Sequence, residues 1–147
     1  MAGLDTRHSS AEESPGLLLW QVTNRWQAAQ RAALKPFGLT HVQFVLLASL
    51  TYLEPALDGP VSQRRLADHA ATDPMMTSQV LRVLEQRGLV VRHPDPADAR
   101  ARALRVTSAG AELANRAVVA VEACDVEFFG PLAGDLAGLL RRLRDLA

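Results

Sequence analysis

The stretch from Val61 to Gly110 constrains the fold of this 147-residue chain most strongly, because it contains two short helices with well-marked ends. Ser62 is a good N-cap for a first helix that runs to about Ala70. The dipeptide Asp73-Pro74 supplies an N-cap and a first helical residue for the second helix. Gly88 follows the last turn of that helix, where a left-handed residue commonly ends a helix. The pattern predicts two helices joined by a tight turn.

Two short apolar segments follow these helices and predict a pair of strands, at 89–92 and 103–106. The residues between them, 93–102, include two prolines and mixed charges, which suit an exposed hairpin arm. Helix, turn, helix and charged hairpin form the layout of a winged helix-turn-helix, here over about 40–107. In that layout the second helix enters a DNA major groove and the hairpin, or wing, lies beside it.

The flanking segments predict a mainly α-helical protein around this small β wing. Residues 1–13 are polar and predict a disordered tail. Ser14-Pro15 starts a helix that reaches about Lys35, and the capping box of Thr40 with Gln43 starts another. The segment 54–60 is expected to be a loop. Two more helices are expected, one from Thr107 to the Gly130-Pro131 pair and one from about Ala133 onward.

The helices expected at about 14–35 and 108–147 carry apolar stripes that one winged core cannot fully cover. The stripes consist of Leu19, Val22, Trp26, Ala29 and Ala33; of Leu113, Ala117, Val121, Cys124 and Phe128; and of Leu136, Leu139, Leu140, Leu143 and Leu146. Packing within one subunit is one explanation. A bundle between two copies of the chain, a homodimer, would also cover them.

Charge is distributed unevenly along the chain, although its total is zero. Residues 61–107 contain eight arginines and five acidic residues, a local charge of +3, which leaves −3 for the rest. A local excess of basic residues is the footprint expected of double-stranded DNA binding. Cys124 is the single cysteine, which excludes an intrachain disulfide. The N-terminus has no hydrophobic signal region and no segment resembles a membrane span, so a cytoplasmic protein without a membrane partner is expected.

The second helix of the pair presents a polar face away from its domain. On a helical wheel its inward residues are Thr77, Val80, Leu81 and Leu84, and its outward residues are Met75, Gln79, Arg82 and Gln86. Glutamine pairs with adenine, arginine pairs with guanine, and an apolar side chain contacts the thymine methyl group. Because the helix N-terminus enters deepest, the expected base-reading residues are Met75, Ser78, Gln79 and Arg82. The alternative is an ordinary solvated face, against which exposed Met75 and Met76 argue.

Two further groups are candidates for contact with the DNA backbone or minor groove. Ser62, Gln63, Arg64 and Arg65 open the first helix of the pair, where the helix dipole and the arginines suit phosphate. Capping plus surface charge explains these four residues equally well. The wing carries Asp98, Arg100 and Arg102. An arginine at a loop tip can enter a minor groove, and Asp98 can hold Arg100 in position; a solvated charge pair is the alternative.

Short motifs recur along the chain in a fixed order. They are Gly38-Leu39-Thr40 with Gln43, Leu66-Ala67, Leu84-Glu85, Arg87-Gly88-Leu89-Val90, Arg92, Asp98-x-Arg100, and Leu104-x-Val106-Thr107 with Gly110. In this order the sequence resembles the MarR (multiple antibiotic resistance regulator) family of winged-helix repressors, over roughly 15–147. The length of the chain predicts one domain, here 14–147, and the resemblance covers nearly all of it. Two positions depart from the family's pattern: Ala99 replaces the middle residue of an Asp-Arg-Arg wing, and Arg82 replaces an aspartate and adds positive charge toward the groove.

The resemblance also implies an obligate dimer on a pseudo-palindromic operator, with repression relieved by a small, often aromatic or anionic, ligand. The family's ligand cleft lies between the dimerisation helices and the winged domain. The candidates for it here are Trp20, Trp26, His41 and Phe44. A role as plain core or interface residues explains the same four side chains at least as well.

Other classes of function find little support. The four histidines have no ligand-like spacing and no second cysteine exists, so no metal site is expected. No glycine-rich phosphate loop, nucleophile motif or carboxylate pair is visible, so we expect neither an enzyme nor a cofactor. Cys124 lies on an apolar stripe, which favours burial over redox sensing. The main alternative to a DNA-binding regulator is a winged-helix module for protein association that does not bind DNA.

Overall fold

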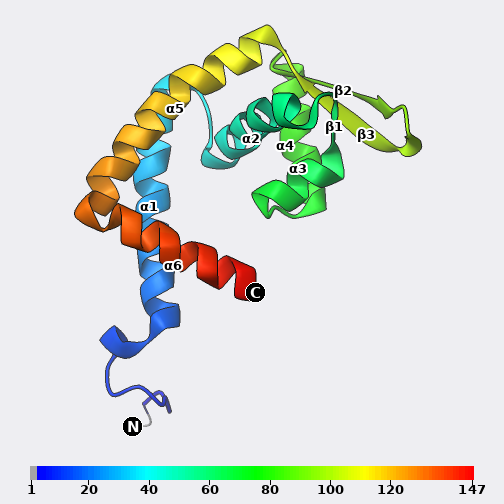
Figure 1. Ribbon diagram of the computed structural model, residues 1–147. Helices are drawn as coiled ribbons and strands as arrows, with labels where there is room; N and C mark the ends of the chain where they lie inside the picture. Colours follow the sequence, from blue (N-terminus) through cyan, green and yellow to red (C-terminus); the bar gives the residue numbers. More distant parts are fainter. Residues whose placement is uncertain (1–2) are drawn as a thin grey trace.

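The computed structural model describes residues 3–147, which form a winged lobe and an arm of long helices (Figure 1). The arm contains α1 (Pro15–Leu34), α5 (Ser108–Phe129) and α6 (Ala133–Leu146). The lobe contains α2 (His41–Leu57), β1 (Val61–Ser62), α3 (Gln63–Ala70), α4 (Pro74–Gln86), β2 (Val90–Asp95) and β3 (Asp98–Val106). Short 3-10 turns lie at Ala11–Glu13, Lys35–Phe37 and Gly130–Leu132. The expected fold, mainly α with a small β wing, is confirmed.

The side-chain caps predicted from the sequence are present. Ser14 and Ser62 each accept a hydrogen bond from a backbone amide in the first turn of α1 and α3. Thr40 and Gln43 form both bonds of a capping box, at 3.1 and 3.2 Å. Asp73 accepts from the amide of Met76 at 2.9 Å. Because a cap depends on residues within one turn, these starts could be read from the sequence.

The expected loop at 54–60 is wrong in its first half, because α2 continues through Pro55 to Leu57. A proline inside a helix removes one backbone hydrogen bond and usually ends the helix. Here the last turn is anchored by tertiary contacts: Leu53 is buried, and the Glu54 carboxylate accepts from the Val106 amide of β3 at 2.8 Å. The helix ends at Asp58, whose backbone is left-handed.

The sheet is larger than predicted. Its three antiparallel strands lie in the order β1-β3-β2, and β1, which the sequence did not reveal, pairs Val61 with Leu104. The strands of the wing extend well into the segment 93–102 that was expected to be an arm. Pro94 is tolerated within β2 because that strand is at the edge of the sheet.

The core of the lobe is built mainly from leucines, which remove large apolar surfaces from water. Its fully buried members include Leu46, Leu47, Leu50, Leu66, Leu81, Leu84 and Leu104. The core continues into the arm through Leu34 on α1 and Ala117 on α5. Thus α1 and α5 are attached to the lobe, and the lobe holds α3, α4 and the wing in a fixed arrangement.

The far end of the arm is exposed in the single chain. No residue of α6 is buried, and large apolar side chains on the three arm helices face solvent, among them Leu19, Trp20, Val22, Val126, Leu139, Leu140, Leu143 and Leu146. The sequence-derived stripes on α1 and α6 therefore lack cover from their own chain, as expected for surfaces that meet another protein.

The N-terminal tail has little regular structure where it is described. Residues 3–13 are exposed apart from the half-buried His8, and the turn Ala11–Glu13 is their only helical segment. Met1 and Ala2, which belong to the tail predicted to be disordered, lie outside the described residues. Within residues 3–147 no single helix is long and apolar enough to span a membrane; only α1 and α2 together, bent by 73°, reach that length and composition.

Candidate functional site

The helix α4 presents the two faces that the wheel predicts. Thr77, Leu81 and Leu84 are fully buried, and the side chains of Gln79, Arg82 and Gln86 are exposed. Met75 is 72% exposed and lies on the same outward face of α4 as Gln79 and Arg82. Met76, in contrast, is half-buried and turns toward α1 and α2. The argument from exposed methionines therefore holds for Met75 alone.

Hydrogen bonds fix the start of α4. The Thr77 hydroxyl donates to the Asp73 carbonyl at 2.7 Å, and the hydroxyls of Thr72 and Thr77 lie 2.7 Å apart. Thr77 is fully buried, so these bonds satisfy a polar group inside the lobe. The tight turn before α4 is thereby locked to its first two turns, which sets the direction in which Met75 and Gln79 project.

Arg92 connects the wing to both helices of the pair. One of its terminal nitrogens, Nη1, donates to the Gln63 side chain at 3.3 Å and to the Ser78 hydroxyl and carbonyl at 3.2 and 3.4 Å. The other, Nη2, lies 3.8 Å from the Glu85 carboxylate. Ser78 and Gln63 are consequently half-buried against Arg92, whereas Arg64 and Arg65 are exposed at the start of α3.

The wing turns back toward the lobe instead of ending in an arginine. Its tip is Pro96-Ala97, and the Asp95 carboxylate accepts from the Ala97 amide at 2.9 Å. Opposite β2, the pairing of β3 jumps from Asp98 to Arg102, which leaves the three residues 99–101 in an irregular segment. Arg100 and Arg102 line a notch of about 550 Å³ with Arg64, Asp68 and Pro74. Three arginines from two elements thus meet beside the start of α4.

Asp98 holds Arg100 in position through its backbone, and not through a pair of charged side chains. The Asp98 carboxylate accepts from the backbone amide of Arg100 at 3.0 Å and no ion pair joins the two side chains. A carboxylate two residues before an amide commonly forms such a turn, because the ring it closes is short and unstrained. Asp98 therefore shapes the backbone of the wing, and the Arg100 guanidinium remains exposed.

A second cavity, of about 600 Å³, lies between α1 and the winged lobe. Its lining includes Trp26 and Arg31 from α1, Thr40 and His41 from the start of α2, and Met76 from α4. The rings of Trp26 and His41 meet edge to face at 5.0 Å. Burial first, and then Arg31, lower the pKa of His41, against the opposing effect of Asp125. This shift in pKa favours the uncharged imidazole, and Arg31 is the one arginine of the lining.

Asp125 of α5 holds Trp26, one of the lining residues of this cavity, by a hydrogen bond. Its Oδ1 atom accepts from the Trp26 indole at 2.8 Å and from the Gln30 amide at 2.7 Å. The arrangement ties α1 to α5 and fixes the Trp26 ring. Of the other residues expected in a ligand cleft, Phe44 is buried in the core and Trp20 is 69% exposed on α1, so neither lines this cavity.

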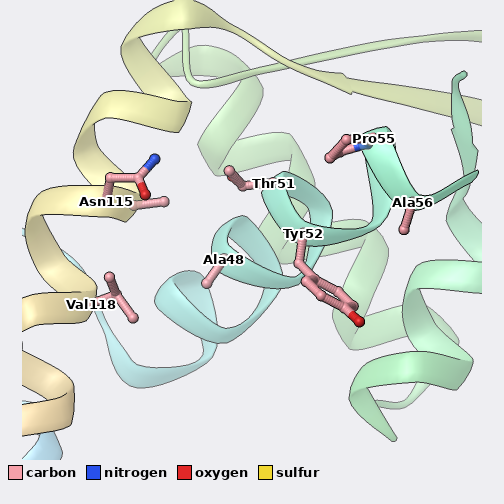
Figure 2. A pocket seen from close by; sticks show the side chains of 8 residues that line it. Ala48, Thr51, Tyr52, Pro55, Ala56, Asn115 and Val118 are labelled. Atoms are coloured by element: carbon pink, nitrogen blue, oxygen red, sulfur yellow. The ribbon is translucent and has the colours of Figure 1, made fainter. Parts of the chain in front are cut away.

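A third hollow lies on the other side of α2. Figure 2 shows Ala48 and Thr51 of α2 directed toward Asn115 and Val118 of α5, whereas the Tyr52 ring points away from α5; these residues and Pro55 line an open groove of about 630 Å³. None of its lining residues carries a charge. On the opposite side of α5, Cys124 is half-buried among small residues, so its expected burial is only partial in the single chain. Burial first, then Asp125 and Glu127, raise the pKa of the Cys124 thiol.

Comparison with known proteins agrees with this architecture. The family model described as "MarR family" matches residues 39–101. The uncharacterised HTH-type transcriptional regulator YdcH of Bacillus subtilis is 43% identical over 124 residues, 84% of each chain. The HTH-type transcriptional repressor Rv2887 of Mycobacterium tuberculosis is 36% identical over 83% of this chain and 85% of its own.

The chain belongs to the MarR family. Among solved structures, BpsR of Bordetella bronchiseptica superimposes with a TM-score of 0.81 at 27% identity, over 94% of this chain and 98% of that one. That structure concerns the mechanism by which 6-hydroxynicotinic acid regulates the DNA binding of BpsR. The expectation of a DNA-binding transcriptional regulator rather than an enzyme is therefore confirmed at the level of the family.

Three residues of the candidate sites in this MarR-family protein were not predicted from the sequence. Arg92 and Asp125 bind partners on other elements, and Arg31 contributes the fixed charge of the α1 cavity. Arg92 was visible as a motif residue but carried no role. Asp125 and Arg31 gave no local signal, because their partners or neighbours in space are distant in the sequence.

Proposed function

We propose that this MarR-family regulator is a homodimeric repressor of a pseudo-palindromic operator. In this proposal α4 reads bases in the major groove through Met75, Ser78, Gln79 and Arg82. The start of α3 and the wing bind the DNA backbone through Ser62, Gln63, Arg64, Arg65, Arg100 and Arg102, with Asp98 shaping the wing. A small aromatic or anionic compound bound between α1 and the winged lobe releases the DNA.

One observation carries the DNA-binding part of the proposal. A single surface collects exposed Met75, Gln79 and Arg82 on α4 beside the arginine-lined notch between α3 and the wing. The α4 residues supply the donors, acceptors and apolar contact that distinguish base edges. The arginines supply positive charge for phosphate and for the minor groove. A solvated surface without a ligand gains nothing from an exposed methionine at its centre.

The homodimer is supported by the exposed apolar surface of the arm. The three helices α1, α5 and α6 leave large leucine, valine and tryptophan side chains in solvent, and α6 buries none of its residues. A two-fold axis through these helices would present two copies of α4 to half-sites about 34 Å apart, or one helical turn of DNA. In this proposal the regulator lies in the cytoplasm, together with the DNA that it binds.

The effector part of the proposal rests on the α1 cavity. An aromatic ring could stack against or beside Trp26, and a carboxylate could pair with Arg31 within reach of the His41 ring. The DNA binding of the related BpsR responds to 6-hydroxynicotinic acid, which has both features. Met76 of α4 lines the same cavity, so an occupant would contact the DNA-reading helix directly.

The experiment selects random duplexes against the purified protein and then follows the affinity for the selected duplex across salt. We expect an inverted repeat and, for six to ten neutralised phosphates, a slope of log K against log salt of about −5 to −9. Arg82→Ala should relax one position in each half-site by about 1–3 kcal/mol. Arg100→Ala should weaken binding, whereas Arg116→Ala, which removes an exposed charge from α5, should not.

Absence of enrichment together with salt-independent binding would refute the proposal and favour a module for protein association. The effector is tested separately with the selected duplex and 6-hydroxynicotinic acid or benzoate as probes. Release of DNA by the wild type but not by Arg31→Ala supports the cavity. Equal release from both proteins would place the compound elsewhere.

A further inference from the structure

Arg92 lies where three elements of the lobe meet and is directed inward from the wing. Along β2 the side chains alternate, so Val90 is buried, Val91 is exposed, and Arg92 again faces the helices. Its side chain is only 14% exposed, which is uncommon for arginine. From this position it reaches Gln63 at the start of α3 and Ser78 in the middle of α4.

The chemistry of this contact restricts what its partners can offer. Arginine carries only hydrogen-bond donors, so Gln63 must present its carbonyl oxygen and Ser78 must present oxygen acceptors to it. The side-chain amide hydrogens of Gln63 and the hydroxyl hydrogen of Ser78 therefore remain available to a different acceptor. Phosphate oxygens and the acceptor atoms of bases are such groups.

We propose that Arg92 is a positioning residue for DNA recognition. It holds Gln63 and Ser78 so that both present donors to one half-site, and it fixes the wing relative to α3 and α4. The inference rests on the proposed binding of an operator by this surface. Arg92 does not itself contact DNA in this arrangement; it acts through the two residues that it orients.

If Arg92 had a purely structural role, removal of its guanidinium would be expected mainly to destabilise the lobe. The contact with Glu85 is long, at 3.8 Å, and the Glu85 side chain is 38% exposed, so this ion pair contributes little to stability. The Ser78 carbonyl lies inside α4, where it also accepts the ordinary helical bond. Removal of the guanidinium therefore leaves few buried groups without partners, and its main consequence falls on the orientation of Gln63 and Ser78.

The test begins with three single variants of the full chain. Arg92→Met removes the guanidinium and keeps an apolar stem, Arg92→Lys keeps the charge, and Arg105→Met removes a matched charge from the outer face of β3, opposite Val91. Affinity is measured for the selected duplex and for a scrambled duplex at one salt concentration, with thermal unfolding in parallel. The ratio of the two affinities reports discrimination.

We expect Arg92→Met to lose about tenfold in this ratio, the size of one good base contact, with little change in the unfolding midpoint. Arg92→Lys should recover part of the loss and Arg105→Met should keep the wild-type ratio. In a Gln63→Ala/Ser78→Ala background, Arg92→Met should add little, because its targets are gone. An equal loss in Arg92→Met and Arg105→Met, or a fully additive loss in the combined variant, would overturn the inference. A wild type that fails to discriminate would instead overturn the proposed function on which the inference rests.

Discussion

Asp125→Ala is expected to destabilise the arm strongly, because one carboxylate oxygen accepts two hydrogen bonds from α1. The Trp26 indole donates to Oδ1 at 2.8 Å and the Gln30 amide donates to it at 2.7 Å. Gln30 is fully buried, and its side-chain carbonyl oxygen Oε1 has no hydrogen-bond partner among residues 3–147. Loss of the Asp125 carboxylate would therefore leave both polar atoms of the buried Gln30 side-chain amide, Nε2 and Oε1, without a hydrogen bond.

The magnitude follows from the burial of the two donors. An unsatisfied buried donor costs about 1–3 kcal/mol, and this full cost applies to Gln30. Trp26 is half-buried, so water can replace part of its lost bond. Together they give about 2–4 kcal/mol for Asp125→Ala. Asp125→Asn keeps an acceptor oxygen at the same place and should cost about 1 kcal/mol.

Thermal and urea unfolding, followed by far-ultraviolet circular dichroism, measure these differences. For a chain of this size about 1 kcal/mol shifts the midpoint by about 2–4 °C, so Asp125→Ala should lower it by about 5–15 °C. All variants are compared at one protein concentration, because self-association would contribute to stability. Glu127→Ala, which removes an exposed carboxylate from the same helix, is the matched control and should stay within about 0.5 kcal/mol. Equal midpoints for Asp125→Ala and Glu127→Ala would refute the reasoning.

Two further predictions concern packing and pH. Gly110→Ala should prevent normal folding or lower the free energy of unfolding by more than about 3 kcal/mol, because a Cβ atom would overlap the Leu89 carbonyl and approach Val106. Gly134→Ala on α6 is the control: its Cβ atom has open space, so it should be neutral or stabilising. Similar unfolding midpoints for the two variants would contradict this prediction. Because burial and then Arg31 lower the pKa of His41 below its ordinary value of 6.5, the folded protein binds that proton less tightly than the unfolded chain. This contribution to stability is complete above about pH 6.5 and is lost as the pH falls through that value toward the folded pKa. Urea unfolding at about pH 7.5 and 5.5 should therefore show a smaller loss of stability in His41→Gln than in the wild type, and equal losses would rule out His41 as the source.

The parts of the fold that could be predicted are those set within one helical turn. Ser14, Thr40, Ser62 and Asp73 cap helices in the structure as their local sequence indicates. The errors lie where distant contacts decide. The last turn of α2 survives Pro55 because Glu54 bonds to β3, and the two-residue strand β1 exists only through its partner Leu104.

The candidate site divides in the same way. The faces of α4 follow from helical periodicity, so the exposure of Met75, Gln79 and Arg82 could be predicted. The wing could not, because its prolines indicated a loop and the sequence contains no information on which atom Asp98 contacts. Arg92 lies 29 residues from Gln63 in the sequence, and Asp125 lies 95 residues from Gln30. Helical and strand periodicity relates only residues that are close in sequence, so it could predict neither contact.

The positions of the buried residues indicate that the lobe can fold without a partner, whereas the arm needs one to cover its apolar side chains. The shared core draws its residues from between Leu34 and Val121, and α6 contributes none of them. A chain without a partner would therefore keep α4 and the wing folded while α6 and the first half of α1 remain exposed. Such a monomer would retain the base-reading face but would have no second α4 at a fixed distance. Affinity for a single half-site should then persist without a preference for the spacing of an inverted repeat, because spacing is a property that only the assembled arm can impose.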